Sequence, residues 1–148
     1  MVGQGSVVGA DIDAGIIEHG RGLAADAGLD NLELRVEDVY ELGLPDDSFD
    51  FIYARLLFQH LAHPGRALAS VRRVLRPGGI ACVVDVDDGL FLLEPEPPEL
   101  APFMARARAG QRAAGGDRYV GRKLPALFRE AGFAEVGVHD PALESGAP

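Results

Sequence analysis

Residues 46–86, DDSFDFIYARLLFQHLAHPGRALASVRRVLRPGGIACVVDV, contain the clearest structural pattern in this chain. An apolar run at 49–53 follows several turn-forming residues and predicts a buried strand. Apolar residues recur at helical spacing over 67–75, and Arg-Pro-Gly-Gly at 76–79 ends the predicted helix. Residues 80–86 are apolar almost throughout, as in a parallel strand covered on both faces. A strand, a crossover helix and a second strand normally close right-handed into a parallel sheet, so we predict an α/β protein.

Two further strands are predicted upstream, and each ends next to an acidic residue. Residues 6–11 are mostly small or β-branched and end at Asp11, after which Asp13 is the expected N-cap of a helix. The second strand, 32–36, is followed closely by Asp38. Open parallel sheets bind ligands at the carboxyl ends of their strands, so we expect Asp11 and Asp38 to face a ligand.

The remainder of the chain predicts two helices and a closing strand. A proline-rich connection leads to a helix at about 99–114, which two glycines end. A further helix around 124–131 precedes a last strand at 134–138. The stripe of apolar residues on the helix at 99–114 is compatible with a lid over a site or with plain packing on the sheet.

Length and composition limit the class of protein. At 148 residues we expect one domain. It would consist of a ligand-binding core at 1–88, a substrate or lid region at 89–120, and a closing helix and strand at 121–140. The formal net charge of −9 argues against a nucleic-acid partner, because phosphate binding needs a basic face. Cys82 is the one cysteine, predicted to be a buried small hydrophobe, and no apolar run approaches membrane-spanning length. We therefore expect a cytoplasmic protein with no membrane partner.

The ordered motifs "VVGADID", "LPDDSFDFIYARLLFQHL" and "LRPGG" resemble those of class I S-adenosylmethionine-dependent methyltransferases. The resemblance covers Ser6 to about Asp88 and is closest to the small-molecule branch, which includes the ubiquinone- and secondary-metabolite-type enzymes. It implies a Rossmann-like open, mostly parallel sheet with flanking helices. It also implies S-adenosylmethionine as cofactor and a small molecule as methyl acceptor.

The resemblance further implies how the cofactor is held. A carboxylate beyond a strand end can accept hydrogen bonds from both ribose hydroxyls, and one on the next strand can accept from the exocyclic amine of adenine. In the family, these roles belong to the residues that match Asp11 and Asp38. Ile12 matches a residue packed on the adenine face, and Val39 one whose backbone N–H meets the base. Arg55 stands where it could touch the methionine carboxylate, although an ordinary surface position is the alternative.

One part of the family pattern is missing from the sequence. The family begins with a strand and a glycine-rich turn, whereas this chain reaches its first predicted strand at Ser6. The absent strand would lie between the strand that ends at Asp11 and the one that begins near Phe51, so two interior edges would be left unpaired. The family's last strand is also expected to be absent, since Leu143 is the one large apolar residue after Val138.

Three outcomes follow for the two edges. The flanking strands pair directly and close the sheet, a partner chain fills the gap, or the chain is an N-terminally shortened form of a longer enzyme. We expect a shortened form of a longer enzyme. If a partner chain fills the gap instead, the simplest partner is a second copy of this chain, which would form a homodimer through the open edges.

The sequence leaves the reaction details open. His60, Tyr53 and Asp87 are candidates for proton transfer if the acceptor is a hydroxyl or an acidic carbon, and the region 88–119 has no pattern that names the acceptor. We expect a methyltransferase whose activity is impaired in the shortened chain. The alternatives are a non-catalytic module that dimerises or regulates a full-length relative, and an NAD(P)-dependent oxidoreductase, which also binds adenosine ribose with an acid after a strand.

Overall fold

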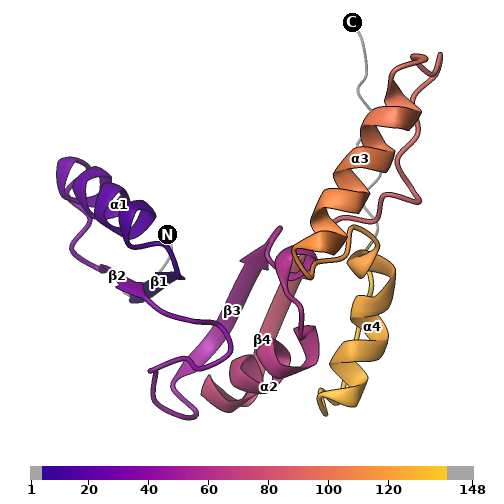
Figure 1. Cartoon of the computed structure of the whole chain (residues 1–148). Helices are drawn as coiled ribbons and strands as arrows, with labels where there is room; N and C mark the ends of the chain where they lie inside the picture. Colours follow the sequence, from indigo (N-terminus) through magenta and orange to yellow (C-terminus); the bar gives the residue numbers. More distant parts are fainter. Residues whose placement is uncertain (1–4, 140–148) are drawn as a thin grey trace, which may run out of the picture.

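The computed structural model describes residues 5–139, and its elements form two groups (Figure 1). The first group holds β1 (Val7–Asp11), α1 (Ala14–Asp26) and β2 (Leu32–Val36). β1 and β2 pair in parallel, from Val7 opposite Leu32 to Asp11 opposite Val36. The Asp13 carboxylate caps α1 by accepting from the N–H groups of Gly15 and Ile16, at 2.7 and 3.1 Å, as predicted.

The second group contains the crossover that the sequence predicts. β3 (Phe49–Arg55) is followed by the 3₁₀ turn η1 (Phe58–His60), α2 (Pro64–Val74) and β4 (Leu75–Val84), and β3 and β4 are parallel. α3 (Leu100–Ala113) and α4 (Val120–Glu130) complete the group. Six buried side chains from η1, α2 and α4 form the core beneath one face of this sheet: Phe58, Ala67, Leu68, Val120, Leu124 and Phe128.

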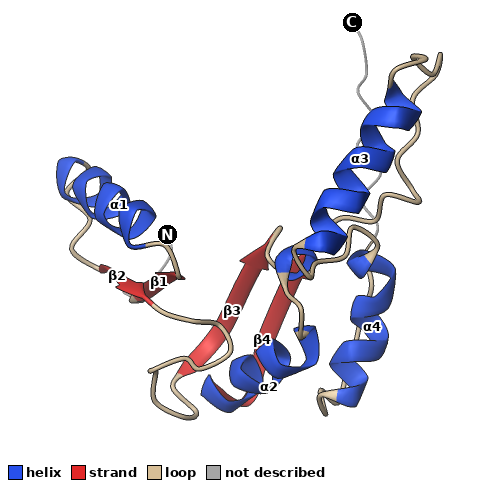
Figure 2. Cartoon of the chain, in the orientation of Figure 1, coloured by secondary structure: helices blue, strands red, loops and turns tan. Residues whose placement is uncertain are grey.

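The two groups do not share a sheet. β1 pairs with β2 and β3 pairs with β4, so the described residues form a pair of two-stranded sheets (Figure 2). Direct pairing of the flanking strands, one of the three outcomes that the sequence left open, is therefore contradicted by the structure. Among residues 5–139, the second edge of β1 and the second edge of β3 have no strand paired to them.

The connection between the groups is attached to α2. The carbonyl of Tyr40 accepts a hydrogen bond from Ser70 Oγ at 2.9 Å, and Arg73 donates to the carbonyl of Leu44 at 2.9 Å and pairs with Asp46. The segment from Tyr40 to Asp46 thus packs with the second group, whereas the strands before it belong to the first. This attachment fixes where β3 begins without bringing β1 to its edge.

The β3–β4 sheet is covered on one face only, which corrects the prediction of a strand buried on both faces. Ala54, Ala81 and Val83 pack against the core beneath the sheet. On the other face, Phe51 is 56% exposed and Ile80 is 63% exposed. This face is exposed because the two groups of elements do not share a sheet. The apolar residues of α1 pack with β1 and β2 and do not cover β3 and β4.

The predicted strand at 134–138 is not formed. The segment pairs with no strand in the described part of the chain, although Val136 packs against the core, and Val138 is 68% exposed. Apolar alternation favoured a strand there, but a strand also needs an edge to pair with. The expectation about Leu143 falls on 140–148, outside the described residues.

Two smaller findings complete the description. Cys82 is half-buried on β4 rather than fully buried. None of the helices within 5–139 has the length and hydropathy that crossing a bilayer requires.

Candidate functional site

Asp11 lies at the carboxyl end of β1, where its carboxylate is only partly used. Oδ1 accepts a hydrogen bond from the backbone N–H of Asp13 at 2.9 Å. Its backbone carbonyl accepts one from the N–H of Glu37 at 2.9 Å, which ties the ends of β1 and β2 together. Within 5–139, Oδ2 has no hydrogen-bond partner. One oxygen of this carboxylate can therefore accept from an external hydroxyl.

Asp38 follows the end of β2 and lies one residue beyond the Glu37 N–H that binds the carbonyl of Asp11. Its Oδ1 accepts from the N–H of Tyr40 at 2.8 Å, and the side chain is exposed. The structure thus brings the two predicted acids to the carboxyl ends of neighbouring strands. In each carboxylate Oδ1 accepts from a backbone N–H in a local turn, and the second oxygen has no hydrogen-bond partner among residues 5–139.

Ile12 and Val39 lie at the same edge. Ile12, directly after Asp11, is 71% exposed, which leaves an apolar side chain in solvent beside two carboxylates. Val39 is half-buried and packs against the core, and its backbone N–H donates to no residue in the described range. Two carboxylates that accept hydrogen bonds, an exposed apolar side chain and a backbone N–H donor together fit the hydrogen-bonding groups and the flat face of an adenosine.

Arg55 belongs to the other group of elements. It ends β3 opposite Val84 of β4, is exposed, and makes no side-chain hydrogen bond within 5–139. Because β3 does not pair with β1, Arg55 and Asp11 are not on one continuous sheet edge. The structure therefore brings together the residues predicted for the adenosine side, but it does not join them to the residue predicted for the methionine side.

A network at the carboxyl ends of β3 and β4 holds η1 in place. The N–H of Gln59 donates to Asp85 Oδ2 at 3.2 Å, directly after β4. The carbonyl of Gln59 accepts from the N–H of Asp117 at 2.8 Å and from Gln111 Nε2 at 2.9 Å, and that nitrogen also lies 2.7 Å from His60 Nδ1. His60, predicted to lie in a short helix past the strand, is thus linked to α3.

Asp87, a predicted candidate for proton transfer, is fully engaged. Its two carboxylate oxygens accept from Arg122 at 2.7 and 2.6 Å, and the N–H of Gly89 adds a third bond at 2.9 Å. The hydrogen bonds from Arg122 hold the pKa of Asp87 below its ordinary value, against the opposing effect of burial and with help from Gly89. A carboxylate held ionised in this way is a poor base, so Asp87 serves α4 as an anchor. Tyr53, the third candidate, is 55% exposed on the open face of β3.

Sequence reasoning missed the ion cluster around Asp88. This carboxylate is 4% exposed and accepts from Arg118 at 2.7 and 3.0 Å and from Arg108 at 3.0 Å. Its backbone N–H donates to the carbonyl of Arg118 at 2.9 Å, and Tyr119 stacks near the guanidinium of Arg108, 5.2 Å from the ring centroid. The cluster fastens α3 to the end of β4. Arg108 and Arg118 lie 20 and 30 positions from Asp88, so no local pattern in the sequence indicated the cluster.

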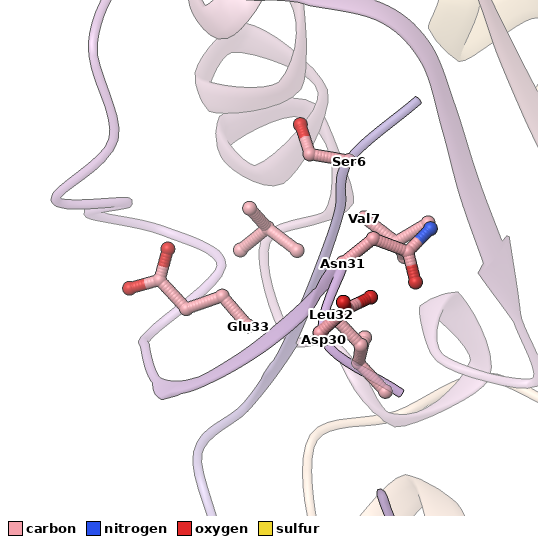
Figure 3. Close-up of a pocket in the computed structure, with 7 residues that line it drawn as sticks. Ser6, Val7, Asp30, Asn31, Leu32 and Glu33 are labelled. Carbon is pink, nitrogen blue, oxygen red and sulfur yellow. The ribbon is translucent and has the colours of Figure 1, made fainter. Parts of the chain in front are cut away.

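A hollow at the opposite end of β1 and β2 does not belong to this site. It has a volume of about 260 Å³ and is lined by residues at the beginning of the two strands, including Ser6, Asp30 and Glu33 (Figure 3). Ligands of parallel sheets bind at the carboxyl ends, where Asp11 and Asp38 lie. Among the described residues no cluster of His, Cys, Asp and Glu could hold a metal ion.

The sequence of this chain matches a known protein family and several known proteins. A family model described as "Methyltransferase domain" matches residues 1–83, more than half of the chain. The chain is 34% identical over 132 residues to an uncharacterized 37.1 kDa protein in transposon TN4556 of Streptomyces fradiae, which covers 88% of this chain and 37% of that protein. It is 28% identical over 149 residues to the ubiquinone/menaquinone biosynthesis C-methyltransferase UbiE of Pseudomonas entomophila, over 92% of this chain and 58% of that enzyme.

Solved structures give the same fold. The chain superposes on a SAM-dependent methyltransferase from Aquifex aeolicus with a TM-score of 0.65 and 19% identity, over 88% of this chain and 60% of that one. The likeness confirms the predicted Rossmann-like α/β architecture with flanking helices. The chain spans less than two thirds of the length of each of these proteins.

Proposed function

This chain belongs to the methyltransferase domain family, and we propose that it takes part in transfer of a methyl group from S-adenosylmethionine to a small-molecule acceptor. S-adenosylmethionine is the cofactor of this family's domain and its structural neighbours. The activity of this chain, its acceptor and the residues that bind the cofactor are the proposal.

The support for this proposal comes from the residues expected to bind the adenosine part of the cofactor. Asp11 and Asp38 are the observation that supports it most, because each keeps one carboxylate oxygen unused while the other caps a turn. We propose that Asp11 accepts from the ribose hydroxyls and Asp38 from the exocyclic amine of adenine. Ile12 would cover one face of the base, and the N–H of Val39 would donate to a ring nitrogen.

The methyl group of the bound cofactor sits on a positively charged sulfur and needs little further activation. The protein's part is to hold an acceptor atom in line with it and to exclude water, since correct positioning supplies most of the acceleration. The acceptor would lie at the carboxyl ends of β3 and β4, between η1 and α3. Arg55 at the end of β3 would pair with the methionine carboxylate once the two sheet edges are joined.

A calorimetric titration with S-adenosylhomocysteine tests the adenosine end. Hydrogen bonds to charged groups contribute about 1.5–3 kcal/mol, so Asp11→Ala and Asp38→Ala should each weaken binding about 10- to 100-fold. Asp30→Ala is the matched control, because Asp30 lies at the amino end of the same strands. Equal weakening by the control would show a general effect on the fold and would remove the support for the site.

A second candidate function has its own observation. The unpaired edges of β1 and β3 and the open apolar face of β3 and β4 favour a module that associates with another chain, in the simplest case a second copy. Such a module would regulate a full-length relative or form a homodimer, and its mass would depend on concentration. The match of residues 1–83 to the methyltransferase domain argues against the nicotinamide-dependent alternative.

A further inference from the structure

His60 and Gln111 meet at the carboxyl ends of β3 and β4, although they are 51 positions apart in the sequence. Gln111 Nε2 lies 2.7 Å from His60 Nδ1 and 2.9 Å from the carbonyl oxygen of Gln59. The amide of Gln111 therefore touches both a ring nitrogen, which can donate or accept, and a carbonyl, which can only accept.

The carbonyl of Gln59 decides which end of the Gln111 amide faces the histidine. Only the NH₂ group can donate to a carbonyl, so the amide oxygen cannot occupy this position. The same carbonyl accepts from the N–H of Asp117 at 2.8 Å, so both of its lone pairs are used. The remaining N–H of the Gln111 amide is then directed to His60 Nδ1, which must accept it.

A neutral imidazole whose Nδ1 accepts a hydrogen bond carries its proton on Nε2. The His60 side chain is exposed, and Nε2 has no hydrogen-bond partner among residues 5–139. His60 thus presents an N–H donor at this edge, whereas a general base would have to present an unprotonated nitrogen. Proton removal, for which His60 was one of three candidates, does not suit this arrangement.

We infer that His60 donates a hydrogen bond from Nε2 to an oxygen of the methyl acceptor, and that Gln111 is the positioning residue that fixes this tautomer. The identity of the ligand as a methyl acceptor rests on the proposed function. The assignment of the His60 tautomer does not depend on that function. The acceptor class that fits is a small molecule with a carbonyl, enolate or phenolate oxygen, since such an oxygen accepts a hydrogen bond without first losing a proton to His60. Because Gln111 is on α3, the placement of α3 and the character of His60 are coupled.

Nitrogen-15 NMR of the chain with labelled histidine tests the tautomer without any ligand. His60→Ala identifies the resonances of this residue among the four histidines. We expect Nδ1 of His60 in the parent chain to have the shift of an unprotonated nitrogen and Nε2 that of a protonated one at neutral pH. In Gln111→Glu the carboxylate can only accept, so the proton should move to Nδ1, while in Gln111→Ala the preference should be lost. A protonated Nδ1 in the parent, or no change in Gln111→Glu, would overturn the inference.

The same spectra test the ligand side with 4-nitrophenolate as the probe. Its addition should shift the Nε2 resonance of His60 and leave that of His63, an exposed histidine outside the network, unchanged. An unmoved Nε2 resonance, or equal shifts at both histidines, would overturn the donor role. If S-adenosylhomocysteine fails to bind while the tautomer and the probe behave as expected, the proposed function fails and the donor assignment of His60 is supported.

Discussion

The carboxylate of Asp88 accepts two hydrogen bonds from the guanidinium of Arg118, at 2.7 and 3.0 Å, and this pair joins the end of β4 to the segment between α3 and α4. Asp88 is nearly inaccessible, whereas Arg118 is 25% exposed. A bidentate pair with one buried partner is worth more than an ordinary surface ion pair.

Asp88→Asn is therefore expected to lower the free energy of unfolding by about 1–3 kcal/mol, because two arginines lose the charge they are paired with. Urea unfolding followed by circular dichroism measures the loss. Asp26→Asn, at the exposed end of α1, is the matched control and should change stability by less than about 0.5 kcal/mol. Equal stabilities for the two variants would contradict the role given to the cluster.

Acid should selectively remove the contribution of Asp87. Its pKa lies below the ordinary value because of the hydrogen bonds from Arg122, so the stabilisation is present above about pH 4 and is lost as the pH falls through the lower folded value. Parent and Asp87→Asn should thus differ in free energy of unfolding at pH 7 and converge in acid. A difference that is constant from pH 7 to pH 3 would show that Asp87 acts by packing rather than by charge.

Gly116 should not tolerate a side chain. A Cβ there would lie 2.7 Å from Gln111 Nε2 and would overlap the carbonyl oxygen of Gln59, so Gly116→Ala should cost about 1–3 kcal/mol and break the hydrogen bonds that orient His60. Gly110→Ala is the control, since that Cβ would meet nothing and alanine favours helix by up to about 1 kcal/mol. Thermal unfolding of both variants gives the comparison, and a Gly116→Ala chain as stable as the parent would contradict the close approach.

The open face of the β3–β4 sheet should promote self-association. Burial of one phenylalanine contributes about 1.5–3 kcal/mol, so Phe51→Lys should raise the dissociation constant of a dimer about tenfold or more. Phe103→Lys removes a phenylalanine that is also exposed, 57% on α3 against 56% for Phe51, and should leave association unchanged. Sedimentation velocity at several concentrations distinguishes these outcomes, and a parent chain that is monomeric throughout would contradict association through this face.

Local sequence signals were enough to predict most of the elements. The carboxylate of Asp13 caps α1 as expected, and Gly78 of the predicted Arg-Pro-Gly-Gly stop adopts a positive φ, although α2 already ends at Val74 and Gly78 lies within β4. These features depend on neighbours a few residues away. The placement of Asp11 and Asp38 at adjoining strand ends also followed from a local pattern combined with parallel pairing.

The predictions that failed depend on distant partners. The strand at 134–138 needed an edge, and coverage of Ile80 needed a helix that instead packs with β1 and β2. The cluster of Asp88 with Arg108 and Arg118 and the contact of His60 with Gln111 join positions 20 to 51 residues apart. No periodicity records such separations, so the structure was needed to find them.

The most direct test of the account compares S-adenosylhomocysteine with S-inosylhomocysteine, in which a carbonyl replaces the exocyclic amine, by calorimetric titration. If Asp38 accepts from that amine, the parent chain and Asp11→Ala should both prefer the adenosyl compound to the same degree, while Asp38→Ala should show a clearly smaller preference. The same preference in all three chains, or no binding of either compound by the folded parent, would contradict the adenosine site proposed at Asp11 and Asp38.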